Sequence, residues 1–118
     1  MIGGFTEPKG SRTGFGALLV GHHEQGRLRY AGKVGTGYDR RILADLRQRL
    51  DELECDRQPF TGGEIREHGA HWVRPELVAD IAFTEWTRDG KLRHPRFIGL
   101  RSDKPATEVV RERPKEKR

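Results

Sequence analysis

The sequence has a single cysteine, Cys55, and no long run of apolar residues. One thiol excludes an intrachain disulfide and agrees with work in a reducing compartment, so we expect a cytoplasmic protein. No apolar stretch reaches the roughly 20 residues that a membrane-spanning helix needs, and we find no secretory signal pattern. These absences argue against a disulfide-stabilised secreted domain and against a membrane protein.

Hydrophobic residues are also scarce, at 33% of the chain against 35% charged residues. A chain of 118 residues forms one domain with a single modest core. Fifteen glycines imply many turns, which favours a small β-rich domain. The formal net charge of +5 is compatible with a polyanionic partner, but it does not choose between nucleic acid, an acidic membrane and neither.

Metal-ligating residues do not form a convincing pattern. Cys55, His68 and His71 lie near one another in the sequence, but one thiol and no Cys-x-x-Cys pair argue against structural zinc. The other histidines do not complete a motif; they are His22, His23 and His94. We therefore expect no metal site.

The first half of the chain predicts three strands and then a helix. The strands are expected over residues 1–6, 15–23 and 27–34, with a hairpin turn at residues 24–26. Asp39 is an expected N-cap, and the helix should run to about Leu53. Its apolar stripe packs on a sheet or barrel end, whereas its mixed-charge outer face, which includes Arg41 and Arg47, is expected to face solvent.

The third predicted strand alternates apolar and cationic residues. With period 2, one face carries Leu28, Tyr30 and Val34. The opposite face then carries Arg27, Arg29, Ala31 and Lys33. Two interpretations stay open: an ordinary solvent-exposed strand face, or a surface that faces the phosphates of DNA.

The second half of the chain predicts a polar loop over residues 54–69 and a long strand over 72–87 with a break at Pro75. Asp89-Gly90 marks a turn, and residues 97–100 are expected to form a brief buried strand that Pro95 introduces. Three strands, a helix and two strands are the order of a five-stranded oligonucleotide-binding (OB) barrel, which is mainly β with one helix between strands three and four.

A charged tetrapeptide, residues 101–104, follows the last predicted strand. Arg101 offers a planar fork of donors and Lys104 a compact charge, a combination that suits a polyphosphate. Asp103 between them can orient one of the cations or sit near a metal. The plain alternative is a solvated basic strand end. Gly35-Thr36-Gly37 lacks the order of a nucleotide-binding glycine loop and is interpreted as a turn whose amides can approach a phosphate.

The Arg-x-Asp-Lys tetrapeptide resembles motif VI of ATP-dependent DNA ligases. Three other stretches, at residues 3–12, 30–38 and 71–87, resemble the same C-terminal OB domain in the expected order. The resemblance is to bacterial ligases, particularly the ligase part of multidomain end-joining enzymes, and so to DNA repair and recombination. It implies an OB domain over residues 1–104. The charged, proline-containing composition of the remaining residues predicts a flexible tail over 105–118.

The resemblance also implies roles for individual residues. In the family, motif VI engages the β- and γ-phosphates of ATP during enzyme adenylation, so Arg101 and Lys104 are expected to contact phosphate and Asp103 to position them. Arg96 is a further expected phosphate contact. DNA-backbone contacts at a nick are expected from five cations: Lys9, Arg12, Arg27, Arg29 and Lys33.

The chain has no Lys-x-Asp-Gly motif of the kind that carries the adenylated lysine in these ligases. The resemblance therefore implies a nucleotidyltransferase domain in cis or in trans, with ATP and Mg²⁺ used by the complete ligase and no cofactor tightly bound to this chain alone. The abrupt start at Ile2-Gly3-Gly4 agrees with a piece of a longer protein. Two alternatives remain: a stand-alone nucleic-acid-binding OB protein, and an interaction domain that recruits repair partners through residues 111–118.

Overall fold

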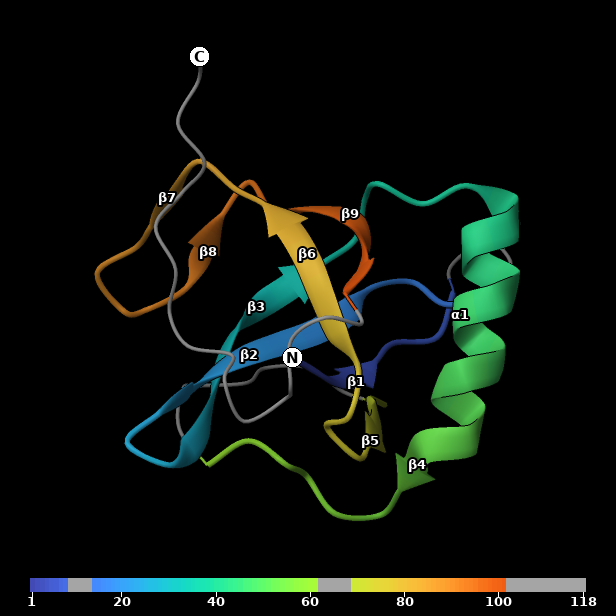
Figure 1. Ribbon diagram of the computed structural model, residues 1–118, viewed down its shortest axis with the longest axis horizontal. Coiled ribbons are helices and arrows are strands. Elements are labelled where there is room, and N and C mark those ends of the chain that lie inside the picture. The colour runs from blue at the N-terminus through green and yellow to red at the C-terminus, as the bar shows by residue number, and fades with distance from the viewer. Residues whose placement is uncertain (9–13, 62–68, 102–118) are drawn as a thin grey trace.

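A computed structural model describes residues 1–8, 14–61 and 69–101 (Figure 1). Within these ranges the chain is mainly β, with one helix beside the strands. The elements, in chain order, are β1 (Ile2–Phe5), β2 (Leu18–Glu24), β3 (Arg27–Val34), α1 (Arg40–Leu53), β4 (Glu54–Cys55), β5 (His71–Val73), β6 (Val78–Ala82), β7 (Glu85–Trp86), β8 (Leu92–Arg93) and β9 (Arg96–Arg101).

The strands form a barrel through antiparallel pairs and two closing hydrogen bonds. One sheet has the order β3-β2-β1-β5-β4, and β6 pairs with β9. Ile2 N donates to Leu77 O over 2.9 Å, which joins β1 to the chain entering β6. Phe97 N donates to Thr36 O over 3.0 Å, which joins β9 to the segment after β3. With β5 and β6 as two parts of one bent strand, this path confirms the predicted OB-fold barrel, in which α1 lies between the third and fourth strands.

The helix begins where the sequence predicts. The Asp39 side chain accepts a hydrogen bond from Ile42 N over 2.7 Å, which satisfies a backbone donor of the first turn. Leu43, Leu46 and Leu50 are buried against the barrel interior. This face closes one side of the barrel, as the position of α1 in Figure 1 shows.

A β-bulge in β3 overturns the predicted alternation of that strand. Gly21 pairs with Tyr30 and Val20 with Gly32, so Ala31 is an extra residue without a partner on β2. An extra residue reverses the faces beyond it. Val34 therefore packs in the main core, whereas Tyr30 packs in a second cluster on the opposite face.

The prediction that three cations share one face of β3 is wrong for the same reason. Arg29 lies opposite His22 and Lys33 lies opposite Leu19, and these β2 partners point to opposite faces of their strand. Ala31, predicted on the cationic face, is buried, with 2% of its surface exposed.

The second hydrophobic cluster covers the outer face of the sheet. Phe60 packs edge-on against Tyr30 with ring centroids 5.3 Å apart, and Thr61 N donates to Leu28 O over 2.8 Å. The segment predicted as a loop over residues 54–69 instead begins with strand β4, because Cys55 pairs with Trp72 of β5. Its residues 62–68 lie outside the described ranges.

The predicted strand over 72–87 is divided into β5, β6 and β7, and the predicted buried strand at 97–100 is only partly buried. Phe97 is 3% exposed, but Ile98 is 49% and Leu100 is 38% exposed. Ile98 also lies at a second bulge, where it has no partner on β6. The predicted Asp89-Gly90 turn connects β7 with β8. In the described ranges, no helix has the length and apolar character needed to cross a membrane.

Candidate nucleic-acid interface

The connection between β1 and β2 has a well-defined base. Thr6 N donates to Ala17 O over 2.9 Å, and Gly16 N donates to Thr6 O over 2.8 Å. The Thr6 hydroxyl also accepts from Ala17 N over 2.9 Å. Lys9 and Arg12, two predicted DNA contacts, belong to this connection but lie outside the described residues, so their contacts stay predictions.

Lys33 lies near this base. It shares a surface pocket of about 480 Å³ with Thr6, Thr36 and Pro95. The glycine turn after β3 passes close to β9, because a Cβ on Gly37 would lie 2.8 Å from Phe97 N, and Gly37 has a φ of +100°. We call this region, defined by Thr6, Lys33, Thr36, Pro95 and Arg96, the stem end of the barrel.

Arg27 and Arg29 lie at the other end of β3, which we call the hairpin end and define by Glu24, Arg27, Arg29 and Gly90. Six positions separate Arg27 from Lys33, or roughly 20 Å at about 3.3 Å per strand residue. Arg29 Nε lies 3.9 Å from the Glu24 carboxylate. The Arg29 guanidinium also lies beside the β7–β8 turn, since its Nε would be 3.3 Å from a Cβ on Gly90. Among the predicted DNA cations that the structure describes, Arg27 and Arg29 therefore lie apart from Lys33.

The charge of Asp89 in that turn is stabilised locally. A hydrogen bond from the Thr87 hydroxyl, with smaller contributions from Lys91 and Arg29, holds the pKa of Asp89 below its ordinary value of 3.8. The carboxylate and the nearby cations balance each other at the hairpin end.

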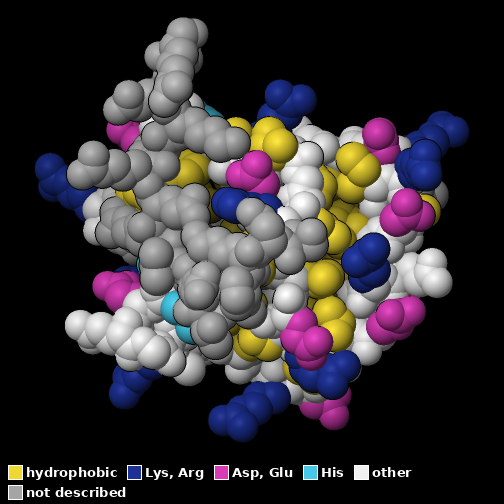
Figure 2. Space-filling view, in the orientation of Figure 1, with side chains coloured by type: hydrophobic (Ala, Val, Ile, Leu, Met, Phe, Trp, Pro, Cys, Tyr) yellow, Lys and Arg dark blue, Asp and Glu magenta, His cyan; other side chains and the backbone are white. Residues whose placement is uncertain are grey.

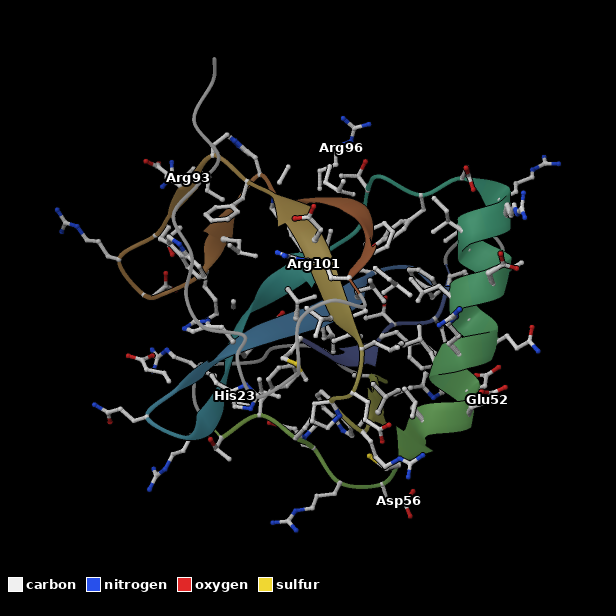
Figure 3. The ribbon with its side chains drawn as sticks, in the orientation of Figure 1. His23, Glu52, Asp56, Arg93, Arg96 and Arg101 are labelled. Atoms are coloured by element: carbon white, nitrogen blue, oxygen red, sulfur yellow. The ribbon has the colours of Figure 1, made fainter. Side chains whose placement is uncertain are left out.

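The two arginines of β9 occupy different surroundings (Figure 3). Arg96 begins β9 at the stem end and points outward, with its Cγ near Gly37. Arg101 ends β9, is half-buried, and pairs with Val78 of β6. Five strand positions correspond to roughly 17 Å, so the backbones of the two arginines lie at opposite ends of the strand. Arg93, on β8, forms an ion pair with Glu85, and its Nε lies 3.0 Å from Glu85 Oε1.

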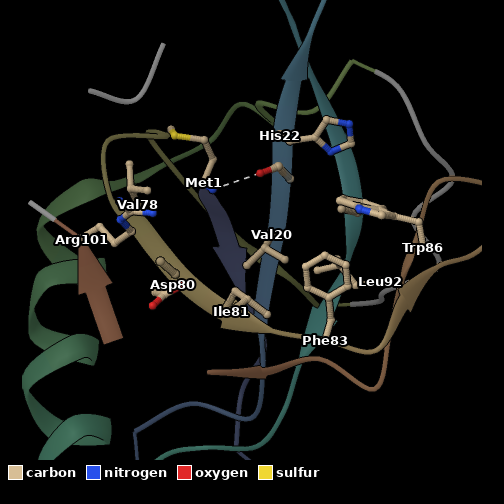
Figure 4. A pocket seen from close by; sticks show the side chains of 13 residues that line it. Met1, Val20, His22, Val78, Asp80, Ile81, Phe83, Trp86, Leu92 and Arg101 are labelled. Carbon is tan, nitrogen blue, oxygen red and sulfur yellow. Dashed lines mark hydrogen bonds between the residues drawn. The ribbon is translucent and has the colours of Figure 1, made fainter. Parts of the chain in front are cut away.

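Arg101 lines a small pocket of about 70 Å³ (Figure 4). The opposite side of the pocket is aromatic, formed by Phe83 and Trp86, whose ring centroids are 5.3 Å apart. The Met1 nitrogen, at another edge, donates to Gly21 O over 3.0 Å. Asp103 and Lys104 lie outside the described residues, so their places relative to this pocket stay predictions.

Both tryptophans take part in packing. Trp86 packs edge-on to the buried His22 at 5.2 Å between ring centroids, and Trp72 lies 6.3 Å from Phe60. These contacts give both tryptophans a packing role.

The sequence did not predict that Arg47 of α1 is largely buried and contacts distant parts of the chain. It lies on a helix whose outer face carries interleaved acidic and basic side chains, which Figure 2 shows along the α1 side. Only 27% of the Arg47 side chain is exposed, and it contacts residues 33 and 40 positions away in the chain. Helical spacing gives no signal for contacts at such separations.

No group of three or more His, Cys, Asp or Glu side chains in residues 1–8, 14–61 and 69–101 is arranged to hold a metal ion.

The barrel, with its helix between the third and fourth strands, defines the fold class of this chain, which is an OB-fold domain. Residues 11–104 match the family described as "ATP dependent DNA ligase C terminal region", and the chain belongs to that family as the C-terminal domain of an ATP-dependent DNA ligase.

Similar proteins agree with this assignment. The chain is 46% identical, over 97% of its length, to the multifunctional non-homologous end joining protein LigD of Pseudomonas aeruginosa, and 44% identical, over 95%, to LigD of Mycobacterium tuberculosis. It spans only 14% and 15% of these relatives. The crystal structure of the ligase domain of M. tuberculosis LigD matches 94% of this chain and 37% of that chain, with a TM-score of 0.87 and 43% identity. A mycobacterial DNA ligase D complexed with ATP matches with a TM-score of 0.81.

Proposed function

We propose that this domain is the C-terminal module of a larger ATP-dependent ligase that contacts duplex DNA at nicks and supplies motif VI cations for the adenylation step. The observation that carries this proposal is the family match over residues 11–104, which ends at Lys104. The placement of Arg101 at the exit of β9 is compatible with a cation presented to another domain.

Motif VI acts electrostatically in this proposal. When a lysine of the nucleotidyltransferase domain attacks the α-phosphate of ATP, negative charge develops on the departing pyrophosphate. Arg101 and Lys104 donate to those phosphate oxygens, and Asp103 orients the two cations. Arg96 lies at the stem end of the barrel, at the start of β9, so we assign its charge to the DNA surface instead.

The DNA contacts come from separate parts of the barrel. Lys9, Arg12 and Lys33 act at the stem end, while Arg27 and Arg29 act at the hairpin end. All five bind the phosphate backbone, because phosphate contacts position a protein without reading sequence. In an OB fold the loop between the first two strands is a common site of oligonucleotide contact, which supports Lys9 and Arg12.

The module depends on a nucleotidyltransferase domain in cis or in trans, because the chain lacks the Lys-x-Asp-Gly motif. ATP and Mg²⁺ belong to the complete ligase, in which the other domain provides the metal ligands. A solved relative complexed with ATP supports the nucleotide. Non-homologous end joining, named for two relatives, is the repair process that we propose for the complete protein.

The test combines the chain with its nucleotidyltransferase domain and measures labelled AMP on the enzyme. We expect Arg101→Ala with Lys104→Ala to reduce adenylation by about a hundredfold or more, the usual effect of removing a placed donor. Binding to a nicked duplex should stay within about twofold of the parent. Unchanged adenylation would contradict the ligase role and favour a stand-alone nucleic-acid-binding OB protein. Label on the 118-residue chain by itself would contradict the need for a second domain.

A further inference from the structure

A surface groove of about 250 Å³ lies between α1 and β9. Its helical wall is a stripe at the spacing of one helix face, formed by Ile42, Asp45, Leu46 and Arg49. Its strand wall is formed by Phe97, Gly99 and Leu100. A helix and a strand that are far apart in the sequence therefore frame one open surface, which we call the α1–β9 groove.

The floor and one edge of the α1–β9 groove are apolar. Leu46 and Phe97 are buried, each with 3% of its surface exposed, whereas Leu100 is exposed at the edge. Among the described residues, the exposed large hydrophobic side chains are Ile98 and Leu100. Figure 2 shows apolar side chains gathered between the strands and α1. Single apolar residues on a surface are ordinary, but two on one strand beside an apolar groove are typical of a contact surface.

Gly99 leaves space in the groove. A Cβ built on Gly99 would meet no described atom within 4 Å, whereas one on Gly37 would lie 2.8 Å from Phe97 N. The barrel itself therefore does not fill the space above Gly99, and a side chain from a partner can enter it.

The rim of the groove carries one charge of each sign. Asp45 and Arg49 are both exposed, and they stand one helical turn apart on α1. A polar rim around an apolar floor is the usual anatomy of a protein–protein interface. Binding to the DNA backbone depends on placed positive charge, and a surface with a carboxylate and exposed aliphatic side chains does not provide it. The groove therefore suits a protein partner and not a nucleic acid.

The position of the groove on β9 indicates which protein that is. Leu100 directly precedes Arg101, the last residue of β9, which is proposed to reach a nucleotide held by the nucleotidyltransferase domain. Successive strand side chains point to opposite faces, but an interface of standard size covers about 800 Å² per partner and reaches far beyond one residue. A domain that meets Arg101 therefore also meets the surface around Leu100.

The length of a solved relative agrees with such a partner. This chain covers 37% of the ligase domain chain of M. tuberculosis LigD, so the larger part of that ligase domain lies outside the module. A second domain of this size is large enough to cover the groove and the exit of β9 together.

We propose that the α1–β9 groove is the surface on which the nucleotidyltransferase domain of the same ligase docks during adenylation, with Ile98 and Leu100 as apolar anchors. The inference rests on the proposed function. Docking removes these side chains from water and holds β9 while Arg101 reaches the pyrophosphate. The groove residues touch no reacting atom, so they are positioning residues that act through the affinity between the two domains.

The experiment titrates the 118-residue chain against the separate nucleotidyltransferase domain and measures the initial rate of labelled AMP transfer at each concentration. Leu100→Gln should raise the half-saturating concentration by about fivefold, because it removes an apolar contact. The rate at saturation should stay within about twofold. Gly99→Leu should have a similar effect, because its side chain occupies the groove. Arg101→Ala should instead lower the rate at saturation.

Arg40 and Arg49 provide a matched control on α1. They are nine positions apart, about two and a half turns, so they lie on opposite sides of the helix, and of the two only Arg49 lines the groove. Arg49→Glu should raise the half-saturating concentration by about threefold and Arg40→Glu by less than about twofold. Equal effects would mean that the net charge of the helix matters and the groove does not, which would overturn the inference.

Joining the two domains separates docking from catalysis. In the complete ligase, a linker gives the domains an effective concentration on the order of millimolar. Leu100→Gln should then slow adenylation by less than about twofold, whereas Arg101→Ala should keep its full loss. A loss of about fivefold for Leu100→Gln in the joined ligase as well would show that Leu100 acts on the chemistry, and would overturn the docking role.

Other results would assign the groove differently, and each would overturn the inference. These are an unchanged half-saturating concentration in folded Leu100→Gln and Gly99→Leu chains, weaker binding of Leu100→Gln to a nicked duplex, and a dimer of the parent chain that Leu100→Gln dissociates. Circular dichroism checks folding; if Leu100→Gln does not fold, Arg49→Glu against Arg40→Glu decides. By contrast, a normal saturated rate in Arg101→Ala would count against the proposed function and leave the docking result unaffected.

Discussion

The two ends of β9 carry the same kind of cation in opposite settings. At its start, Arg96 is exposed beside the glycine turn and the stem-end pocket. At its finish, Arg101 is half-buried over a small pocket with an aromatic side. The difference shows that two arginines within one short basic stretch can belong to separate surfaces, so a cluster of charge in the sequence is not by itself one binding site.

The largest expected effect concerns how the start of β9 is packed. Gly37→Ala should lower the free energy of unfolding by about 3 kcal/mol, because its Cβ would meet the Phe97 backbone and its φ is positive. Gly99→Ala, further along β9, should change it by less than about 0.5 kcal/mol, since nothing lies within 4 Å of the added atom. Urea denaturation of both variants measures the contrast, and equal losses would mean that β9 is not closed against the glycine turn.

The next effect separates the two arginines by function. In the reconstituted ligase, Arg101→Ala should slow adenylation by about a hundredfold, whereas Arg96→Ala should slow it by less than about threefold. Single-turnover transfer of labelled AMP to the enzyme gives both rates. A larger loss for Arg96→Ala would reverse the assignment of the two ends.

A smaller difference in affinity is expected between substitutions at the stem end and at the hairpin end when DNA binding is measured. Lys33→Met should weaken nicked-duplex binding by about threefold and reduce the salt slope by about 0.9, as for one lost phosphate contact. Arg29→Met should have the smaller effect, less than about twofold, because Glu24 lies 3.9 Å from its guanidinium and weakens its contact with phosphate. Fluorescence anisotropy over a range of salt concentrations measures both, and a greater loss for Arg29→Met would move the main DNA surface to the hairpin end.

The smallest effect is a pH dependence at the hairpin end. The folded-state pKa of Asp89 is below 3.8, chiefly through the Thr87 hydroxyl. Its contribution to stability is therefore present above its unfolded pKa and is lost as the pH falls through the lower folded value. NMR titration of the Asp89 carboxyl should give a midpoint under 3.8, and Thr87→Val should bring it back toward that value.

Periodic and local features of this fold were readable from the sequence. The helix from Arg40 to Leu53 and its Asp39 cap follow from an apolar stripe and one capping residue, and β3 occupies the predicted range, Arg27–Val34. The Asp89-Gly90 turn follows from its dipeptide. Each of these depends on residues within a few positions of one another.

The features that escaped prediction depend on partners far away in the chain. The bulges at Ala31 and Ile98 are defined only by the neighbouring strand, and the bulge at Ala31 reverses the faces beyond it. The two-residue strand β4 exists because β5 pairs with it. Arg47 has an ordinary helical spacing, and its contacts with Glu7 and Gly14 become visible only when the chain is folded.

The unpaired Ala31 has a consequence for comparing this chain with its relatives. In a homologue that lacks one residue here, Leu28 and Tyr30, or else Val34, would leave their hydrophobic cluster for the opposite face of the sheet. Such a deletion should therefore be accompanied by an insertion nearby or by a changed apolar pattern. When the role of a basic residue in a relative is assigned to a residue of this chain beyond Ala31, the two positions should therefore be matched by strand pairing and not by the sequence alignment alone.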